Sequence, residues 1–361
     1  AITRAHRTVA VAGTHGKTTT SSMTTAALLG AGADVTSIVG GKMLGIDQAV
    51  PGAVLGEPGG LLVVEADESD GTFIELVAQV GVVTNIEPDH LEFYGGEAGL
   101  FDAFDEFIRQ PDLNHAVVCG ADPGVLASLA RTGQLSADLT VYGDREDSDV
   151  HLRFSPPTSQ VHIGSHVVGV TPRLPGLHNA LNLTGALAVV DALGLDTAAA
   201  AASLSDFAGV GRRFERRGVG AGVEVVDDYA HLHGEILAAV RAAREVCDGR
   251  VHVAFQPHRY SRTEALWQTY AHALATADSV VITDIFPSGE APRPGISSKL
   301  VFDDLRRIAP SLEVAHVGSI EEVAPALAAV AEAGDLCLLL SAGDLPAIAE
   351  QVLTELESRG G

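Results

Sequence analysis

The sequence predicts an α/β protein with two domains: a P-loop-type central domain with a mainly parallel sheet, and a C-terminal, Rossmann-like, doubly wound domain. Short β-branched runs alternate with alanine-rich helical stretches along the chain, the pattern of βαβ units. The alternation pauses at residues 207–220, where glycine mixes with positive charge, and then begins again. We therefore expect domains at 1–206 and 207–361, sizes that can each bury a core.

The first half contains near-continuous apolar runs, which are typical of strands covered on both faces of a sheet. The predicted strands are 8–12, 35–39, 61–66, 81–85, 116–119 and 139–142. Three further segments predict an antiparallel meander, at 150–154, 160–163 and 167–171. A helix is predicted at 179–193, and Gly194 would end it.

The second half repeats the alternation and predicts a doubly wound sheet, which binds ligands at the carboxyl ends of its strands. The predicted strands are 223–227, 251–255, 279–284, 312–316 and 336–340. The predicted helices are 234–246, 264–277, 320–333 and 345–358.

Charge and cysteine usage exclude several classes of partner. The chain has 47 acidic and 23 basic residues, a formal net charge of −24, which repels nucleic acid and anionic lipid. Cys119, Cys247 and Cys337 lie far apart without CxxC spacing, which favours buried thiols over disulfides or zinc. No signal peptide and no membrane-spanning stretch is recognisable. We expect a cytoplasmic protein with neither nucleic-acid nor membrane partners.

A phosphate-binding loop is predicted where the first strand ends. The run AGTHGKTTT, residues 12–20, follows that strand and begins a helix-compatible stretch, the context that such a loop requires. Backbone N–H groups would cradle the phosphates, Lys17 would reach the outer ones, and the Thr18 hydroxyl would bind Mg²⁺. Val11 stands where the usual pattern has glycine, so the match is incomplete. The predicted binding residues are Gly13, Thr14, His15, Gly16, Lys17, Thr18 and Thr19.

Two more strand ends carry polar residues. EADESDGTF clusters Glu65 with Asp67, Glu68 and Asp70, at the sheet edge where such folds place metal and ligand contacts. A solvated acidic loop is the alternative. TNIEPDH brings His90 to the end of the next strand, where a metal ligand and a structural histidine are both open interpretations.

A pair of asparagines opens the predicted helix after the meander. In PGLHNALN, Asn179 and Asn182 are three residues apart, so both amides could point to one ligand. Asn179 could equally cap the helix.

Charged residues also follow strands of the second half. His258, Arg259 and Arg262 come after one strand, and Asp228 ends another. Arginines at a strand end suit bidentate capture of a carboxylate or phosphate. An ordinary exposed arginine pair is the alternative.

Taken together, these motifs resemble the Mur ligase family. The stretches that carry the resemblance follow the family order: AGTHGKTTT, EADESDGTF, TNIEPDH, PGLHNALN, GRRF, DDYAH, FQPHRYSRT and FPSGEAPRPGISSKL. The resemblance is strongest to the alanine-adding branch, which makes a peptidoglycan precursor. It implies that ATP phosphorylates the carboxylate of UDP-N-acetylmuramate and that the amine of L-alanine then displaces phosphate from the acyl phosphate, with Mg²⁺ as cofactor.

The resemblance also implies individual roles. Lys17 would hold the outer phosphates, Thr18 and Glu65 would bind one Mg²⁺, and His90 a second. The implied ATP contacts are Asn179 and Asn182, with Arg213 and Asp228 closing over the nucleotide from the C-terminal domain. The implied pocket for the amino-acid carboxylate is His258, Arg259 and Arg262. The implied catalytic set is Lys17, Glu65, His90, Arg213 and Asp228.

The chain departs from the family in two places. Members normally begin with a uridine-diphosphate-binding domain of about one hundred residues, whereas this chain begins just before the phosphate loop. We expect it to correspond to the central and C-terminal domains. After the tyrosine of DDYAH the family has His-His-Pro-Thr-Glu, and this chain has HLHGE at residues 231–235.

Three interpretations of function stay open from the sequence. Besides the alanine-adding ligase, the chain could be a related ligase with another acceptor, in muropeptide recycling or of the polyglutamate or cyanophycin type. It could also be a truncated, non-catalytic nucleotide-binding module. A monomer and a homodimer are both open.

Overall fold

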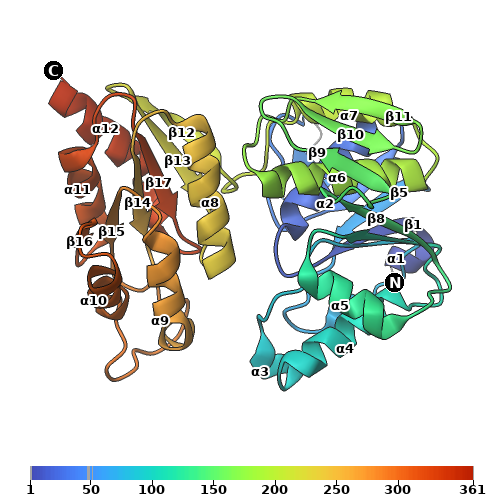
Figure 1. Ribbon diagram of the computed structural model, residues 1–361, viewed down its shortest axis with the longest axis horizontal. Helices are drawn as coiled ribbons and strands as arrows, with labels where there is room; N and C mark the ends of the chain where they lie inside the picture. The colour runs from blue at the N-terminus through green and yellow to red at the C-terminus, as the bar shows by residue number, and fades with distance from the viewer. Residues whose placement is uncertain (1, 47–48, 51, 361) are drawn as a thin grey trace. The chain divides into compact units, whose positions relative to one another are not determined.

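The computed structural model describes residues 2–46, 49–50 and 52–360, and its fold is α/β as predicted. The chain divides into two compact units, Ala1–Gly211 and Arg212–Gly361 (Figure 1). The division follows Gly211 and so falls within residues 207–220, where the sequence pattern pauses, close to the expected limit at residue 206. Each unit is built around its own sheet.

In the described part of the first unit, eleven strands form one sheet in the order β11-β10-β9-β8-β7-β6-β1-β5-β2-β4-β3. Neighbouring strands from β9 to β2 are parallel, and antiparallel strands extend both edges. The strands are β1 Arg7–Ala12, β2 Val35–Ile38, β3 Ala49–Val50, β4 Ala53–Val54, β5 Leu61–Glu65, β6 Val80–Val83, β7 His115–Cys119, β8 Asp138–Gly143, β9 Val150–Arg153, β10 Ser159–Ile163 and β11 His166–Val170. The predicted meander is confirmed as β9-β10-β11.

Helices cover both faces of this sheet (Figure 1). On one face lie α2 Lys17–Gly30, α6 Leu177–Ala192 and α7 Thr197–Asp206. On the other lie α3 Leu91–Tyr94, α4 Glu97–Ile108 and α5 Pro123–Thr132. The short helix α1 Ile2–Ala5 precedes β1, and the 3₁₀ helix η1 Thr72–Glu75 follows β5.

Helix α2 begins at the phosphate loop and is buried along most of its length, although it is rich in threonine and serine. It packs against α6 and α7, and every side chain from Thr18 to Leu28 is buried. Buried hydroxyls bond back to carbonyls of their own helix, as Ser22 does to Thr18 (2.7 Å). The small side chains of α2 therefore let three helices pack closely on the sheet, with Ser22 and Thr25 bonding back to the helix backbone.

The second unit has a six-stranded sheet in the order β12-β13-β17-β14-β15-β16. The strands are β12 Glu215–Gly220, β13 Val223–Asp228, β14 Val251–Phe255, β15 Ser279–Ile282, β16 Glu313–His316 and β17 Leu336–Leu340. All neighbours are parallel except the edge pair β12-β13. The helices are α8 His233–Val246, α9 Tyr260–Leu274, α10 Lys299–Ile308, α11 Val323–Val330 and α12 Ala349–Gly360, with 3₁₀ helices η2 Ile320–Glu322 and η3 Leu345–Ile348. Helices α8 and α9 lie on one face and α11 and α12 on the other (Figure 1).

The predicted strands are confirmed with shifts of one or two residues at their ends, and several elements were not predicted. The helix predicted at 264–277 begins four residues earlier, at Tyr260, and the one predicted at 320–333 ends at Val330. The unpredicted elements include α4, α5, α7, α10 and β12. Strand β12 carries part of the charged stretch that the sequence pattern had assigned to the domain boundary.

Candidate functional site

Three loops meet at the carboxyl edge of the first sheet because their strands are neighbours in the order β6-β1-β5. The loop after β1 is fixed to the loop after β6 by direct bonds. The His15 N–H donates to Asn85 Oδ1 (2.7 Å), and the Thr84 hydroxyl donates to the His15 carbonyl (2.7 Å). The predicted phosphate loop is thus held on its neighbour at the sheet edge that binds ligands in such folds.

Two glycines make the loop's shape possible. Gly16 caps α2 with φ 79°, and a Cβ there would lie 2.8 Å from Asn182 Oδ1. Gly13 has φ 139°, and a Cβ there would lie 2.0 Å from Thr84 Oγ1. The chain can therefore turn tightly into the N-terminus of α2, the kind of position at which helices can bind anions.

Lys17 lies folded over this loop. Its ammonium donates to the carbonyls of Gly13 (2.8 Å) and Thr14 (3.2 Å) and forms an ion pair with Glu68 Oε2 at 2.6 Å. The Asp67 carboxylate lies at 4.0 Å. Glu68 is 1% exposed, and burial raises its pKa above the ordinary value although Lys17 acts in the opposite direction. The sequence placed Glu68 in an acidic cluster but gave it no role.

Thr18 and Glu65 lie side by side at the start of α2 and the end of β5. The Thr18 hydroxyl donates to Glu65 Oε1 (2.8 Å), and the Gly40 N–H donates to Oε2 (2.6 Å). A hydroxyl and a carboxylate next to a phosphate loop are hard oxygen donors that fit Mg²⁺, which takes few protein ligands. Among the described residues, no group of three or more His, Cys, Asp or Glu side chains could hold a metal.

His90 contacts its own neighbour in the chain. Its backbone N–H donates to Asp89 Oδ1 (2.9 Å), and its ring Nε2 lies 3.5 Å from Asp89 Oδ2. It adopts φ 52° at the start of α3. The structure brings Lys17, Thr18 and Glu65 together, and the second Mg²⁺ ligand role of His90 stays a prediction.

The two asparagines of α6 are both buried and make different contacts. Asn182 lies against Gly16 of the loop, and its role as an ATP contact stays a prediction. Asn179 donates its amide to the Pro175 carbonyl (2.7 Å). The helix is capped by Gly176, so the alternative of Asn179 as the N-cap is wrong.

In the second unit, Asp228 joins two backbone segments. Its carboxylate accepts the N–H groups of Phe214 (2.7 Å) and Ala230 (2.8 Å), and burial raises its pKa to about 6. The adjacent Tyr229 ring has the guanidinium groups of Arg212 and Arg213 each 4.9 Å from its centroid. The predicted residues Arg213 and Asp228 are therefore held in one small cluster.

The predicted amino-acid pocket gathers beyond β14. Arg262 Nη1 lies 3.4 Å from His258 Nδ1, and the His231 ring lies 5.7 Å from that of His258. Burial, with His231 and the nearby arginines, lowers the pKa of His258 to about 4. Burial also lowers the pKa of His231, so both rings are neutral at pH 7 and leave the positive charge to arginine. Arg259, with φ 66°, precedes α9.

Sequence reasoning missed two residues of this cluster, Tyr229 and His231. The signal was present, because both lie in the DDYAH motif. In the departing stretch HLHGE, Glu235 accepts the N–H groups of His231 (3.0 Å) and Leu232 (3.2 Å), and Leu232 is buried.

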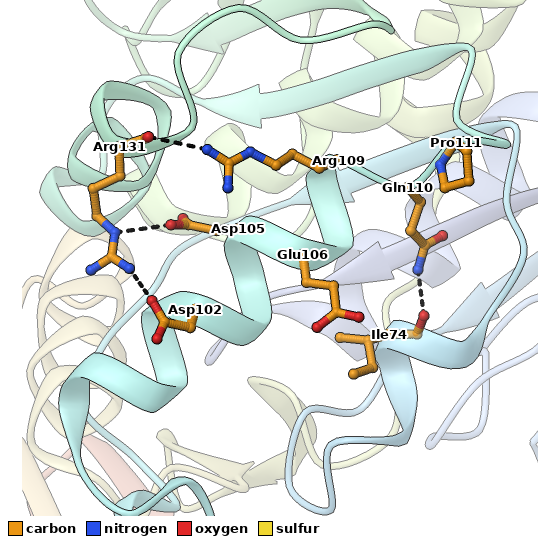
Figure 2. A pocket seen from close by; sticks show the side chains of 8 residues that line it. All are labelled: Ile74, Asp102, Asp105, Glu106, Arg109, Gln110, Pro111 and Arg131. Atoms are coloured by element: carbon orange, nitrogen blue, oxygen red, sulfur yellow. Dashed lines mark hydrogen bonds and ion pairs between the residues drawn. The ribbon is translucent and has the colours of Figure 1, made fainter.

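A hollow of about 770 Å³ opens elsewhere in the first unit (Figure 2). It is lined by Ile74, Asp102, Asp105, Glu106, Arg109, Gln110, Pro111 and Arg131, none of them a predicted site residue. Arg131 is paired with Asp102 and Asp105, and Arg109 donates to the Arg131 carbonyl (3.1 Å). Because these charges largely satisfy one another, the sheet edge is the stronger candidate site.

No helix in the described residues is long and apolar enough to cross a membrane.

Comparison with known proteins agrees with both units. A family model of the Mur ligase middle domain matches residues 11–190, and one of the Mur ligase glutamate ligase domain matches residues 212–343. The UDP-N-acetylmuramate–L-alanine ligase of Paenarthrobacter aurescens is 40% identical over 97% of this chain and 75% of its own length. The ligase of the same name from Kineococcus radiotolerans is 42% identical over 97% of this chain and 74% of its own.

Solved structures show the same fold. UDP-N-acetylmuramate–alanine ligase from Thermotoga maritima matches with a TM-score of 0.77 and 27% identity, over 98% of this chain and 76% of that one. Thermotoga maritima MurF ligase in complex with ADP matches with a TM-score of 0.73 over 98% of this chain and 81% of that one, and at 20% identity this likeness concerns the fold alone. The chain spans about three quarters of the length of these relatives.

Proposed function

The chain belongs to the Mur ligase family, and on that basis we propose that it is an ATP-dependent ligase that joins L-alanine to the carboxylate of UDP-N-acetylmuramate. Relatives named UDP-N-acetylmuramate–L-alanine ligase are about 40% identical in sequence to this chain over nearly its whole length. The observation that carries the proposal is the placement of Lys17, Thr18 and Glu65 around a helix N-terminus. That arrangement suits a nucleoside triphosphate and its metal.

The reaction has two steps, a phosphoryl transfer and the attack of an amine on the acyl phosphate. A carboxylate oxygen of UDP-N-acetylmuramate attacks the γ-phosphorus of ATP, and the bond to the bridging oxygen of ADP breaks. The amine of L-alanine then attacks the carbonyl carbon of the acyl phosphate, inorganic phosphate leaves, and the amine loses a proton. Catalysis of phosphoryl transfer depends mainly on holding the reactants in line and on neutralising charge.

We assign the first unit to the phosphates. The N–H groups from Gly16 to Thr19 bind phosphate oxygens, Lys17 contacts the outer phosphates, and Asn182 contacts the nucleotide beside Gly16. Gly13, Thr14 and His15 shape the loop, since the N–H groups of Thr14 and His15 donate to Asn85. Thr18 and Glu65 would hold Mg²⁺, with His90 at a second ion, and bound Mg²⁺ would neutralise charge on the transferring phosphoryl group.

We assign the second unit to the amino acid and to closure over ATP. The carboxylate of L-alanine is bound by Arg259 and Arg262, and the neutral ring of His258 accepts or donates one hydrogen bond beside them. Arg213 contacts the nucleotide, and Asp228 holds the backbone next to it. Because its substrates are ATP and a nucleotide-linked sugar, we propose that the protein acts in the cytoplasm.

The direct test is release of phosphate with ATP, Mg²⁺, UDP-N-acetylmuramate and L-alanine, with the amide product identified by mass. Phosphate release should require both UDP-N-acetylmuramate and L-alanine. Other amino acids should compete poorly with L-alanine if the alanine assignment is correct. Lys17→Ala and Glu65→Ala should each lower kcat by roughly a hundredfold or more, since the first removes a positive charge beside the phosphates and the second a ligand of the Mg²⁺ that would neutralise them.

Two results would contradict parts of this proposal. Full activity in Lys17→Ala would exclude the assignment of the loop. Calorimetry that finds ATP binding without any affinity for UDP-N-acetylmuramate would instead support a nucleotide-binding module.

A further inference from the structure

The ion pair between Lys17 and Glu68 is the most deeply buried charge pair at the sheet edge. The Lys17 side chain is 12% exposed and that of Glu68 2%, and the ammonium and carboxylate are 2.6 Å apart. The ammonium also donates hydrogen bonds to the Gly13 and Thr14 carbonyls. Lys17 is thus held by two carbonyls of the loop and by the Glu68 carboxylate.

This engagement conflicts with the role that the phosphate loop requires of Lys17. Two of the three ammonium protons donate to loop carbonyls, so an outer phosphate must compete with the Glu68 carboxylate for the ammonium. The carbonyls of Gly13 and Thr14 belong to the loop itself and are neutral. Glu68 carries the one full negative charge within hydrogen-bond distance of Lys17 in the described structure, so it is the partner that another anion most directly displaces.

We infer that Glu68 is a positioning residue that holds Lys17 over the loop and competes with the phosphates of the nucleotide for its ammonium. The inference rests on the proposed function, because it takes the loop to bind a nucleotide. The nucleotide affinity then depends on how strongly the Glu68 carboxylate competes with the phosphates for the Lys17 ammonium.

Displacement leaves Glu68 in unfavourable surroundings. The carboxylate stays buried, while Asp67 on its own loop adds negative charge, and the Tyr94 hydroxyl of α3 donates to its backbone carbonyl rather than to its side chain. A buried carboxylate without its counter-ion takes up a proton more readily. Nucleotide binding should therefore be accompanied by proton uptake at Glu68, and affinity should fall as the pH rises.

The test is calorimetric titration of the full chain with ADP and Mg²⁺ at pH 6 and pH 8. Glu68→Gln keeps the size of the side chain and removes its charge, so it should bind ADP roughly three- to tenfold more tightly at pH 8. The gain in affinity should be smaller at pH 6. Titrations in two buffers of different ionisation heat should show proton uptake on ADP binding by the wild type and none by Glu68→Gln.

Asp67→Asn is the matched control. It removes a neighbouring carboxylate that is 62% exposed and 4.0 Å from the same ammonium, so the affinity should change less than about twofold. Glu68→Asp keeps the charge on a shorter side chain and should bind ADP with an affinity between those of the wild type and Glu68→Gln. If Glu68→Gln does not fold, as judged by circular dichroism, Glu68→Asp decides the question.

Equal or weaker ADP binding in Glu68→Gln, with clear binding by the wild type, would overturn the competition and leave the proposed function intact. Absence of ADP binding by the wild type would overturn both. Glu68→Asp that binds no more tightly than the wild type would likewise overturn the competition.

Discussion

Single residues at the phosphate loop act through backbone shape as much as through charge. Gly16 and Gly13 occupy conformations in which a side chain would meet Asn182 and Thr84. Lys17 and Glu68 then form their ion pair within the space that this tight turn leaves. The two glycines of AGTHGKTTT follow from that geometry, since only glycine adopts these backbone angles without strain where other atoms lie so close.

Gly16→Ala tests this requirement at the residue scale. We expect a loss of about 1–2 kcal/mol in unfolding free energy from the left-handed backbone and a fall in ADP affinity of roughly tenfold or more, because the Asn182 contact and the turn both shift. Urea denaturation and ADP titration measure the two effects.

Gly32→Ala is the control for that experiment. Gly32 has φ 80°, almost the same angle, but no atom lies within 4 Å of its Cβ position. It should lose similar stability and keep its ADP affinity. Equal loss of ADP affinity in both variants would show that backbone strain alone, rather than the Asn182 contact, explains the effect.

Among the elements, the amino ends of β14, β15 and β17 are joined by a buried polar network. His252 is fully buried, with one ring nitrogen 2.7 Å from Ser279 Oγ and the other 2.8 Å from Asp335 Oδ2. Burial alone would raise the pKa of Asp335, but bonds from His252 and from the N–H groups of Arg250 and Glu332 outweigh it and hold the pKa at about 2. The network aligns three strands at the amino edge of this sheet, opposite the carboxyl edge that carries Asp228 and His258.

Asp335→Asn should lower the unfolding free energy at pH 7 by about 2 kcal/mol. The folded pKa lies below the unfolded value of about 4, so this stabilisation is complete above pH 4 and is lost as the pH falls toward 2. Urea denaturation from pH 7 to pH 3 should therefore show the gap between variant and wild type closing. A gap that is constant with pH would contradict the linkage.

The elements that the sequence pattern did not predict have recognisable causes. Helix α4 buries Leu100, Ala103, Phe104, Phe107 and Ile108, a clear helical spacing that was overlooked because the run is aromatic rather than alanine-rich. Strand β12 pairs antiparallel at the edge of its sheet, where charge is tolerated, so its apolar alternation is weak.

For the whole molecule, the two units each have a core of their own. The core of the second unit includes Val225, Ala254, Leu327 and Leu339, drawn from its strands and helices. The core of the first unit gathers around Phe73, Phe104 and Phe107, whose rings lie 5.1 and 5.4 Å apart in pairs. Separate cores predict separate folding units.

Residues 212–361 expressed alone should therefore fold and unfold cooperatively in urea. Within this fragment, Leu339→Ala should lower stability by about 2–5 kcal/mol, since it empties a fully buried site. Val219→Ala, at a side chain that is 64% exposed, should change it by less than about 0.5 kcal/mol. A fragment without a cooperative transition would contradict the independence of the two cores.

The sequence by itself determined most of the strands, the position of the loop after β1 and the family, because apolar runs, glycine positions and motif order are local properties of the chain. Only the tertiary structure decided which side chains meet. Lys17 pairs with Glu68, and Asn182 lies against Gly16, because β1 and β5 are neighbours and α6 packs on α2. Such pairs depend on strand order and helix packing, which no local pattern encodes.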